Sequence, residues 1–168
     1  AWWRGQLTGA AVLELPTDRP RPILAQAPSG QLHPLLRPSL TEPLRAFSRD
    51  HGATLFMTLL AGFQAVLHRH TGQTDISVGT PIANRNHGDV EKLIGFFVNM
   101  LVLRTDLSGE PSFRALLDRV REVTLGAYAH QEIPFEKLLE SLALPRDPAR
   151  TPIFQTMLVL QNYPQERI

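Results

Sequence analysis

The stretch "LIGFFVNMLVLRTDL", residues 93–107, is a nearly continuous apolar run with Gly95 near one end and Asp106 at the other. Such a run suits a central strand buried on both faces better than a helix, so we expect an interior strand over 96–103. Asn99 interrupts the run. Because a polar side chain in a buried strand must find hydrogen bonds, we expect Asn99 to tie the strand to a loop, with a substrate contact as the alternative.

The segments around this run alternate between helical and extended patterns. Thr54 caps a mostly apolar segment that Gly72 stops, and Ser112 precedes apolar residues at helical spacing. We expect helices over 2–7, 41–51, 55–70, 113–127 and 136–144, and strands over 32–38, 74–80 and 154–162. With no repeat and no phosphate-binding glycine loop, this order predicts an α/β fold, a two-layer sandwich with a mixed β-sheet.

Composition narrows the function classes. The chain has 168 residues, the size of one domain, with 17 basic and 16 acidic side chains. A net charge of +1 provides no basic field for nucleic acid. Cysteine is absent, which excludes disulfides, thiolate metal sites and a cysteine nucleophile. The apolar segment 55–67 is too short to span a bilayer, so we expect no membrane insertion.

The histidines are the first candidates for chemistry. His130 in "AHQEIPFEKLL", residues 129–139, ends the amphipathic helix, where it favours capping of the last carbonyls over catalysis. His68 and His70 are two residues apart on a helix, so they face opposite sides and cannot share a metal ion. His87 and Asp89 on a polar loop are an alternative acid/base pair. We expect no metal site.

Three segments carry a family resemblance. "IGFFVNMLVLRTD", "HQEIPFEKLL" and "RDPARTPIFQTMLVLQN" resemble the fifth, sixth and seventh core motifs of the condensation domains of nonribosomal peptide synthetases. "WWRGQLTGAAVLELPTDRPRP" and "GQTDISVGTPIANRN" are similar to the family's linking segments. The departures are small: Trp2, Glu132, Thr151 and Ile153 replace commoner residues. The resemblance gives a structural role to the motif residues His130, Gln131, Pro134, Phe135, Glu136, Arg146, Asp147 and Arg150.

The family's catalytic signature HHxxxDG does not occur in the chain, which has no pair of adjacent histidines. The resemblance therefore implies that residues 1–168 are a partial C-terminal subdomain, a half-domain of the fold seen in chloramphenicol acetyltransferase. Residues 1–30 are the linker-like N-terminal segment of that subdomain. "WWRGQL" looks like the middle of a helix without a cap, so we expect the chain to lie within a longer polypeptide. We expect it to be inactive alone.

The intact family domain joins an upstream acyl or peptidyl thioester to the amine of a downstream aminoacyl thioester. Both substrates ride on phosphopantetheine arms of peptidyl and acyl carrier proteins, so no cofactor is expected on this chain. The resemblance implies three kinds of partner: the N-terminal half of the domain, the carrier proteins and a neighbouring adenylation domain. It also implies a cytoplasmic enzyme of secondary metabolism that makes an antibiotic or a siderophore.

In that setting this half supplies one wall of the substrate tunnel. The candidates for the wall are Arg85, Asn99, Gln161 and Asn162. Polar side chains such as Asn162 and Arg85 are suited to hydrogen-bonding a tetrahedral intermediate. For Arg85 the alternative is an ion pair with Asp89 or Glu91.

Three other functions stay open. The chain is alternatively a carrier-protein-docking or binding module without activity, or part of an epimerisation or ester-forming domain of the same fold. A self-sufficient acyltransferase that uses His87 or His130 is the third alternative, against which the absence of a histidine–aspartate motif counts.

Overall fold

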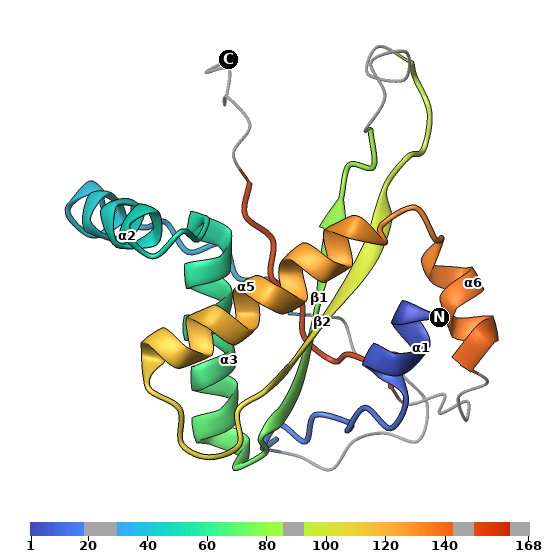
Figure 1. The fold of residues 1–168 in the computed structure, drawn as a ribbon, viewed down its shortest axis with the longest axis horizontal. Coiled ribbons are helices and arrows are strands. Elements are labelled where there is room, and N and C mark those ends of the chain that lie inside the picture. Colours follow the sequence, from blue (N-terminus) through green and yellow to red (C-terminus); the bar gives the residue numbers. More distant parts are fainter. Residues whose placement is uncertain (19–29, 86–92, 143–149, 162–168) are drawn as a thin grey trace.

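The structure is a computed structural model that describes residues 1–18, 30–85, 93–142 and 150–161. Along the described part of the chain, three helices precede two consecutive strands, and two more helices follow (Figure 1). In order they are α1 (Trp2–Leu7), α2 (Pro38–Asp50), α3 (Leu55–Thr71), β1 (Asp75–Ile82), β2 (Asn99–Asp106), α5 (Phe113–Ala129) and α6 (Phe135–Leu142).

β1 and β2 form an antiparallel pair with a register that runs from Asp75 opposite Asp106 to Ile82 opposite Asn99. On its other edge, β1 is joined by residues 156–158 in a single parallel bridge at Gly79. There the Gly79 N–H donates to the Thr156 carbonyl at 2.9 Å, and the Leu158 N–H donates to the Gly79 carbonyl at 3.0 Å. The pairing is therefore mixed, as predicted, although the sheet itself has only two strands in the described part of the chain.

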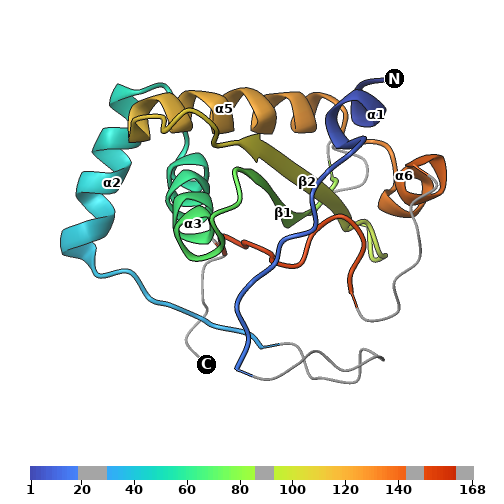
Figure 2. The same ribbon diagram turned by 90° about the horizontal axis from the view of Figure 1, so that it is seen from below.

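Both faces of the sheet are covered. Leu101, Val102 and Leu103 follow one another in β2, and each is at most 1% exposed. Since successive strand residues point to opposite faces, the two faces are buried alike. Figure 2 shows α5 and α3 against one side of the strands, with residues 8–15 and 150–157 on the other. This layered α/β arrangement confirms the predicted fold class.

The central helices begin and end where their local signals predict. The Thr54 hydroxyl accepts the Met57 N–H at 3.2 Å, and Gly72, in a left-handed conformation with φ of 70°, ends α3. At the start of α5, the Ser112 hydroxyl accepts the Ala115 N–H at 3.3 Å. Among the described residues, no helix has both the length and the apolar character needed to cross a membrane.

The outer elements differ from the prediction. The strand expected over 32–38 does not form: residues 31–37 are exposed and unpaired, and α2 begins at Pro38, three residues before the expected cap Thr41. Proline is tolerated in the first helical turn but cannot donate to a sheet, and this chain has it at 34 and 38. The short helix α6 ends at Leu142, and residues 143–144 lie outside the described residues.

The two apolar strands also differ from the prediction: the interior strand is shifted by three residues along the chain, and the last strand was predicted too long. The interior strand begins at Asn99 and not at Phe96, whose side chain is 91% exposed. The last strand, expected over 154–162, is reduced to the bridge at Met157 within its described part. A strand forms only where a neighbour pairs with its backbone, and the register with β1 stops at Asn99.

Candidate functional site

Asn99 is the centre of a hydrogen-bond cluster at the start of β2, and it is only 7% exposed. Its Nδ2 donates to the carbonyls of Gln131 at 2.8 Å and Ile133 at 2.9 Å. Its Oδ1 accepts the N–H groups of Phe135 at 3.0 Å and Met100 at 2.9 Å. Both hydrogens and both lone pairs of the amide are used, so this one side chain binds β2 to the loop that leads into α6.

His130 lies at the C-terminal end of α5, where its contacts are with backbone and with rings. Its Nδ1 is 2.9 Å from the Gly126 carbonyl, and its own carbonyl accepts the Trp3 indole N–H at 2.8 Å. The imidazole stacks on Trp2 with ring centroids 4.7 Å apart and planes 3° apart. Among the described residues, no carboxylate forms an ion pair with His130. These contacts indicate a structural role for His130, which caps α5 and holds α1 in place. They argue against a role as a general base.

The other residues of the sixth motif build the start of α6. The Pro134 carbonyl accepts the Leu138 N–H at 3.1 Å. The Phe135 ring packs against Phe154, with centroids 5.7 Å apart. Glu136 is exposed in the first turn, where a carboxylate interacts favourably with the helix dipole.

The seventh motif is seen in part, because Arg146 and Asp147 lie outside the described residues. Arg150 makes a bidentate ion pair with Glu14, with N–O distances of 2.5 and 3.1 Å. Ile153 has φ of 68°, which is strained for a β-branched residue. The neighbouring Phe154 lies over Gly79, where an added Cβ would be 2.5 Å from the ring.

Of the four predicted wall residues, Arg85, Asn99 and Gln161 lie in the described part of the chain. The hydrogen bonds of Asn99 go to the backbone of residues 100–135. Gln161 is exposed, and Asn162 lies outside the described residues. A role in a tunnel wall stays a prediction for all of them.

Arg85 holds the base of the loop between β1 and β2. Its Nη1 donates to the Leu93 carbonyl at 2.9 Å, and its guanidinium lies over the Phe97 ring at 4.3 Å from the centroid. The ion-pair partners proposed for it, Asp89 and Glu91, lie outside the described residues. The observed contacts give Arg85 a part in shaping this loop.

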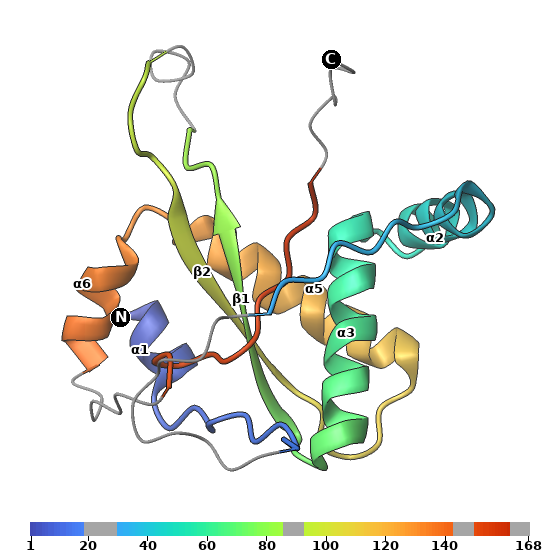
Figure 3. The same cartoon turned by 180° about the vertical axis from the view of Figure 1, so that it is seen from behind.

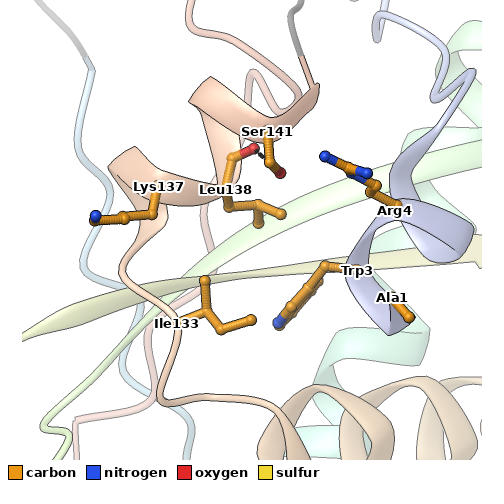
Figure 4. Close-up of a pocket in the computed structure, with 7 residues that line it drawn as sticks. All are labelled: Ala1, Trp3, Arg4, Ile133, Lys137, Leu138 and Ser141. Atoms are coloured by element: carbon orange, nitrogen blue, oxygen red, sulfur yellow. Dashed lines mark hydrogen bonds between the residues drawn. The ribbon is translucent and has the colours of Figure 1, made fainter.

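A cavity of about 240 Å³ opens between α1 and α6 (Figure 4). It is lined by Ala1, Trp3, Arg4, Ile133, Lys137, Leu138 and Ser141. Trp3 and Leu138 are buried, whereas Arg4 and Lys137 are exposed. No local sequence pattern indicated this cavity, because its walls come from segments about 130 positions apart. Ile133 and Lys137 lie within the sixth motif, which is the one signal that pointed to this side.

The remaining histidines form no metal centre in the described part of the chain, where no group of three possible ligands occurs. His68 Nδ1 is 2.8 Å from the Gln73 carbonyl, and His51 Nδ1 is 2.9 Å from the Phe47 carbonyl. Both rings therefore bond to backbone at helix ends. The alternative pair His87 and Asp89 lies outside the described residues.

Comparison with protein families gives a match to the model described as "Condensation domain", over residues 1–168. Among curated proteins, a linear gramicidin synthase of Brevibacillus parabrevis is 53% identical over 99% of the chain. Phosphinothricin tripeptide synthetase PhsB of Streptomyces viridochromogenes is 46% identical over 97% of it. The chain spans only 2% and 14% of the lengths of these relatives.

Solved structures give the same likeness. The X-domain from teicoplanin biosynthesis has a TM-score of 0.85 and 32% identity over 93% of the chain, which covers 35% of that protein. A four-domain nonribosomal peptide synthetase bound to AMP and glycine has a TM-score of 0.89 and 25% identity, with 96% of the chain and 12% of that protein covered. The first condensation domain of the calcium-dependent antibiotic synthetase, in complex with a substrate analogue, has a TM-score of 0.68 and 25% identity. The chain covers 34% of it.

Proposed function

We propose that this chain, which belongs to the condensation-domain family, works as the C-terminal part of a nonribosomal peptide synthetase domain that forms peptide bonds between carrier-bound thioesters. The observation that carries the proposal is the coverage: the family model matches all 168 residues, while the chain spans about a third of a solved condensation domain. Such a match, which covers the whole of this chain but only part of the solved domain, is expected for a section of a larger domain.

The chain's contribution is orientation. Peptide bond formation from a thioester needs the amine and the carbonyl carbon held at reacting distance, and such positioning supplies a large part of the rate. Asn99 uses its whole amide to bind the loop 131–135 to β2, which supports a fixed wall on this side of the domain. The chain has no cysteine, so it cannot divert the acyl group to a thiolate of its own.

The partner most directly supported is the rest of the condensation domain. Leu32, Leu35, Ile94 and Phe96 are each more than 90% exposed. Monomeric proteins rarely leave several large apolar side chains this bare, so a covering surface is expected. The same proposal implies two further kinds of partner: carrier proteins with phosphopantetheine arms, and a neighbouring adenylation domain. It also implies that the enzyme is located in the cytoplasm.

One observation favours a second function, that of a binding module without condensation activity. The X-domain from teicoplanin biosynthesis, to which the chain is similar, has been solved as a complex with OxyB. That protein shows that a relative of this fold is found bound to another protein. An epimerisation or ester-forming domain has no observation of its own in this structure.

Reconstitution distinguishes these functions. The purified chain is mixed with two loaded carrier proteins, with and without a separately expressed N-terminal half, and peptide is measured by mass spectrometry. We expect peptide only when both halves are present. Peptide formed by the chain without the other half would overturn the proposal and revive a local histidine such as His87. Binding of both halves without peptide would favour the binding module.

A further inference from the structure

Arg104 uses every donor of its guanidinium, and most of its partners lie far away in the sequence. Its Nε and Nη2 donate to the two carboxylate oxygens of Asp75 at 2.8 and 2.9 Å. Its Nη1 donates to the carbonyls of Gln6 at 2.9 Å and Thr8 at 3.0 Å, and Nη2 reaches the Gly9 carbonyl at 3.3 Å. The hydrogen bond to Asp75, opposed in part by burial, raises the pKa of Arg104, which keeps this group charged.

Arg104 binds the Gln6 carbonyl in the last turn of α1 and the carbonyls of Thr8 and Gly9, which directly follow the helix. Last-turn carbonyls of a helix have no partner within the helix, so a guanidinium there satisfies and anchors them. Gln6 returns a bond from its Nε2 to the Arg104 carbonyl at 3.2 Å. A helix of six residues does not persist without such anchors. The position of α1 is therefore set where it meets β2.

The other end of α1 reaches the loop that follows α5. The Trp3 indole N–H donates to the His130 carbonyl, and the Trp2 ring stacks on the His130 imidazole. From His130 the chain passes directly into residues 131–135, which Asn99 binds back to β2. The contacts therefore form a closed circuit: Arg104 joins β2 to α1, the tryptophans join α1 to the loop, and Asn99 joins the loop back to β2. Two of these segments also line the cavity between α1 and α6: Trp3 comes from α1 and Ile133 from the loop (Figure 4).

We propose that Arg104 is a positioning residue for the sixth-motif loop: by anchoring the end of α1 it holds Trp3 against His130, and so fixes the gap between α1 and α6 without lining it. Asn99 sets one wall of that gap and Arg104 the other. A planar guanidinium with five donors is required, because lysine offers a single point of attachment and cannot meet the Asp75 carboxylate and three carbonyls together. Any effect on condensation rests on the proposed function, whereas the position of Trp3 does not.

Hydrogen exchange followed by NMR on the full 168-residue chain tests this directly. In Arg104→Lys we expect the Trp3 indole N–H to exchange at least about tenfold faster, as loss of an anchored helix end requires. The amides of Val102 and Leu103, in the middle of β2, should change less than about threefold. Arg119→Lys is the matched control, since Arg119 donates to the carbonyls of Asp106 and Ser108 and not to α1. It should leave the Trp3 signal unchanged.

Two results would overturn the proposal. One is faster exchange at the amides of residues 6–11 with no change at Trp3, which would make Arg104 a purely local clamp. The other is an equal rise at Trp3, Val102 and Leu103, which would mean general destabilisation. Where Arg104→Lys does not fold, Asp75→Asn replaces it, because the amide keeps one acceptor oxygen for Arg104 and should give a smaller rise at Trp3 in the same direction. Since the readout is exchange and not peptide formation, failure of the condensation proposal would leave this result intact.

Discussion

Two parts of the molecule lie outside the sheet and the central helices, and they differ in the contacts that hold them in place. In residues 1–15, which we call the tied segment, side chains from the body of the fold bind the backbone. The Leu13 N–H donates to Gln155 Oε1 at 2.7 Å, and the Glu14 N–H donates to Gln73 Oε1, also at 2.7 Å. Residues 30–37 and 93–98, which we call the outlying segments, carry Leu35 and Phe96 at 94% and 91% exposure.

The difference shows that apolar composition alone does not place a segment. The outlying segments are about as apolar in sequence as the tied segment. Most of their side chains nevertheless remain exposed, and residues 30–37 run across the front of the molecule in Figure 3 without a strand partner. In the tied segment, Leu7 and Leu13 are each 1% exposed because amides and carboxylates replace the missing backbone partners. The tied segment finds its hydrogen-bond partners within this chain, whereas our proposal assigns the outlying segments a covering surface outside it.

The largest effect should come from Asn99, the residue that binds β2 to the loop. Asn99→Ala removes the partners of two carbonyls and of the Phe135 N–H in a buried place. We expect a loss of about 3 kcal/mol in the free energy of unfolding, at about 1 kcal/mol for each bond. Urea unfolding of the chain measures it. Gln161→Ala removes an exposed amide and serves as the control. A loss no greater than that of the control would show that this cluster does not stabilise the fold.

The bridge that brings residues 156–158 to β1 depends on Gly79. In Gly79→Ala the new methyl group would lie 2.5 Å from the Phe154 ring, too close for ordinary contact. We expect a loss of about 2 kcal/mol from overpacking. Gly62→Ala in α3 meets no atom within 4 Å and should stabilise the chain by up to about 1 kcal/mol, as alanine does in a helix interior. Equal melting temperatures for the two variants would contradict the close packing of Phe154 on β1.

A smaller effect is expected at His130, which joins the tied segment to the sixth motif. His130→Ala loses the bond to the Gly126 carbonyl, so stability should fall by about 1 kcal/mol. In an intact parent domain, condensation should fall no further than this loss of folded protein requires. A catalytic base is expected to contribute about a thousandfold to the rate. His130 would be shown to be catalytic if the variant lost that much activity at an unchanged melting temperature.

The outlying segments should give the smallest effect on the stability of the chain by itself. Leu35→Ser and Phe96→Ser change side chains that contact little, so we expect changes below about 0.5 kcal/mol. The affinity of each variant for a separately expressed N-terminal half should fall by about tenfold, which corresponds to about 1.4 kcal/mol. Val66→Ser, at a residue 52% exposed on α3, is the control for binding. Unchanged binding in both variants would remove the outlying segments from the contact with that half.

The features that could be predicted from the sequence are those whose signals lie close together along the chain. The caps Thr54 and Ser112 act within three residues, so the starts of α3 and α5 were predicted. Strand lengths depend on partners elsewhere, so the runs over 32–38 and 154–162 were wrong. That Asn99 needs hydrogen bonds was predictable from burial, but its partners were not, since they follow it by more than 30 positions. The cavity and the anchoring by Arg104 both depend on contacts between the first ten residues and distant parts of the chain. No local sequence pattern therefore indicates them.

Hydrogen exchange compared between this chain and the intact parent domain tests the central claim most directly. The claim is that the tied segment is complete in the chain and that the outlying segments are covered only in the whole domain. We predict that the amides of residues 93–98 exchange at least about tenfold more slowly in the intact domain, while those of residues 11–14 exchange alike in both. Equal exchange at residues 93–98 in the two proteins, or new protection confined to residues 11–14, would contradict it.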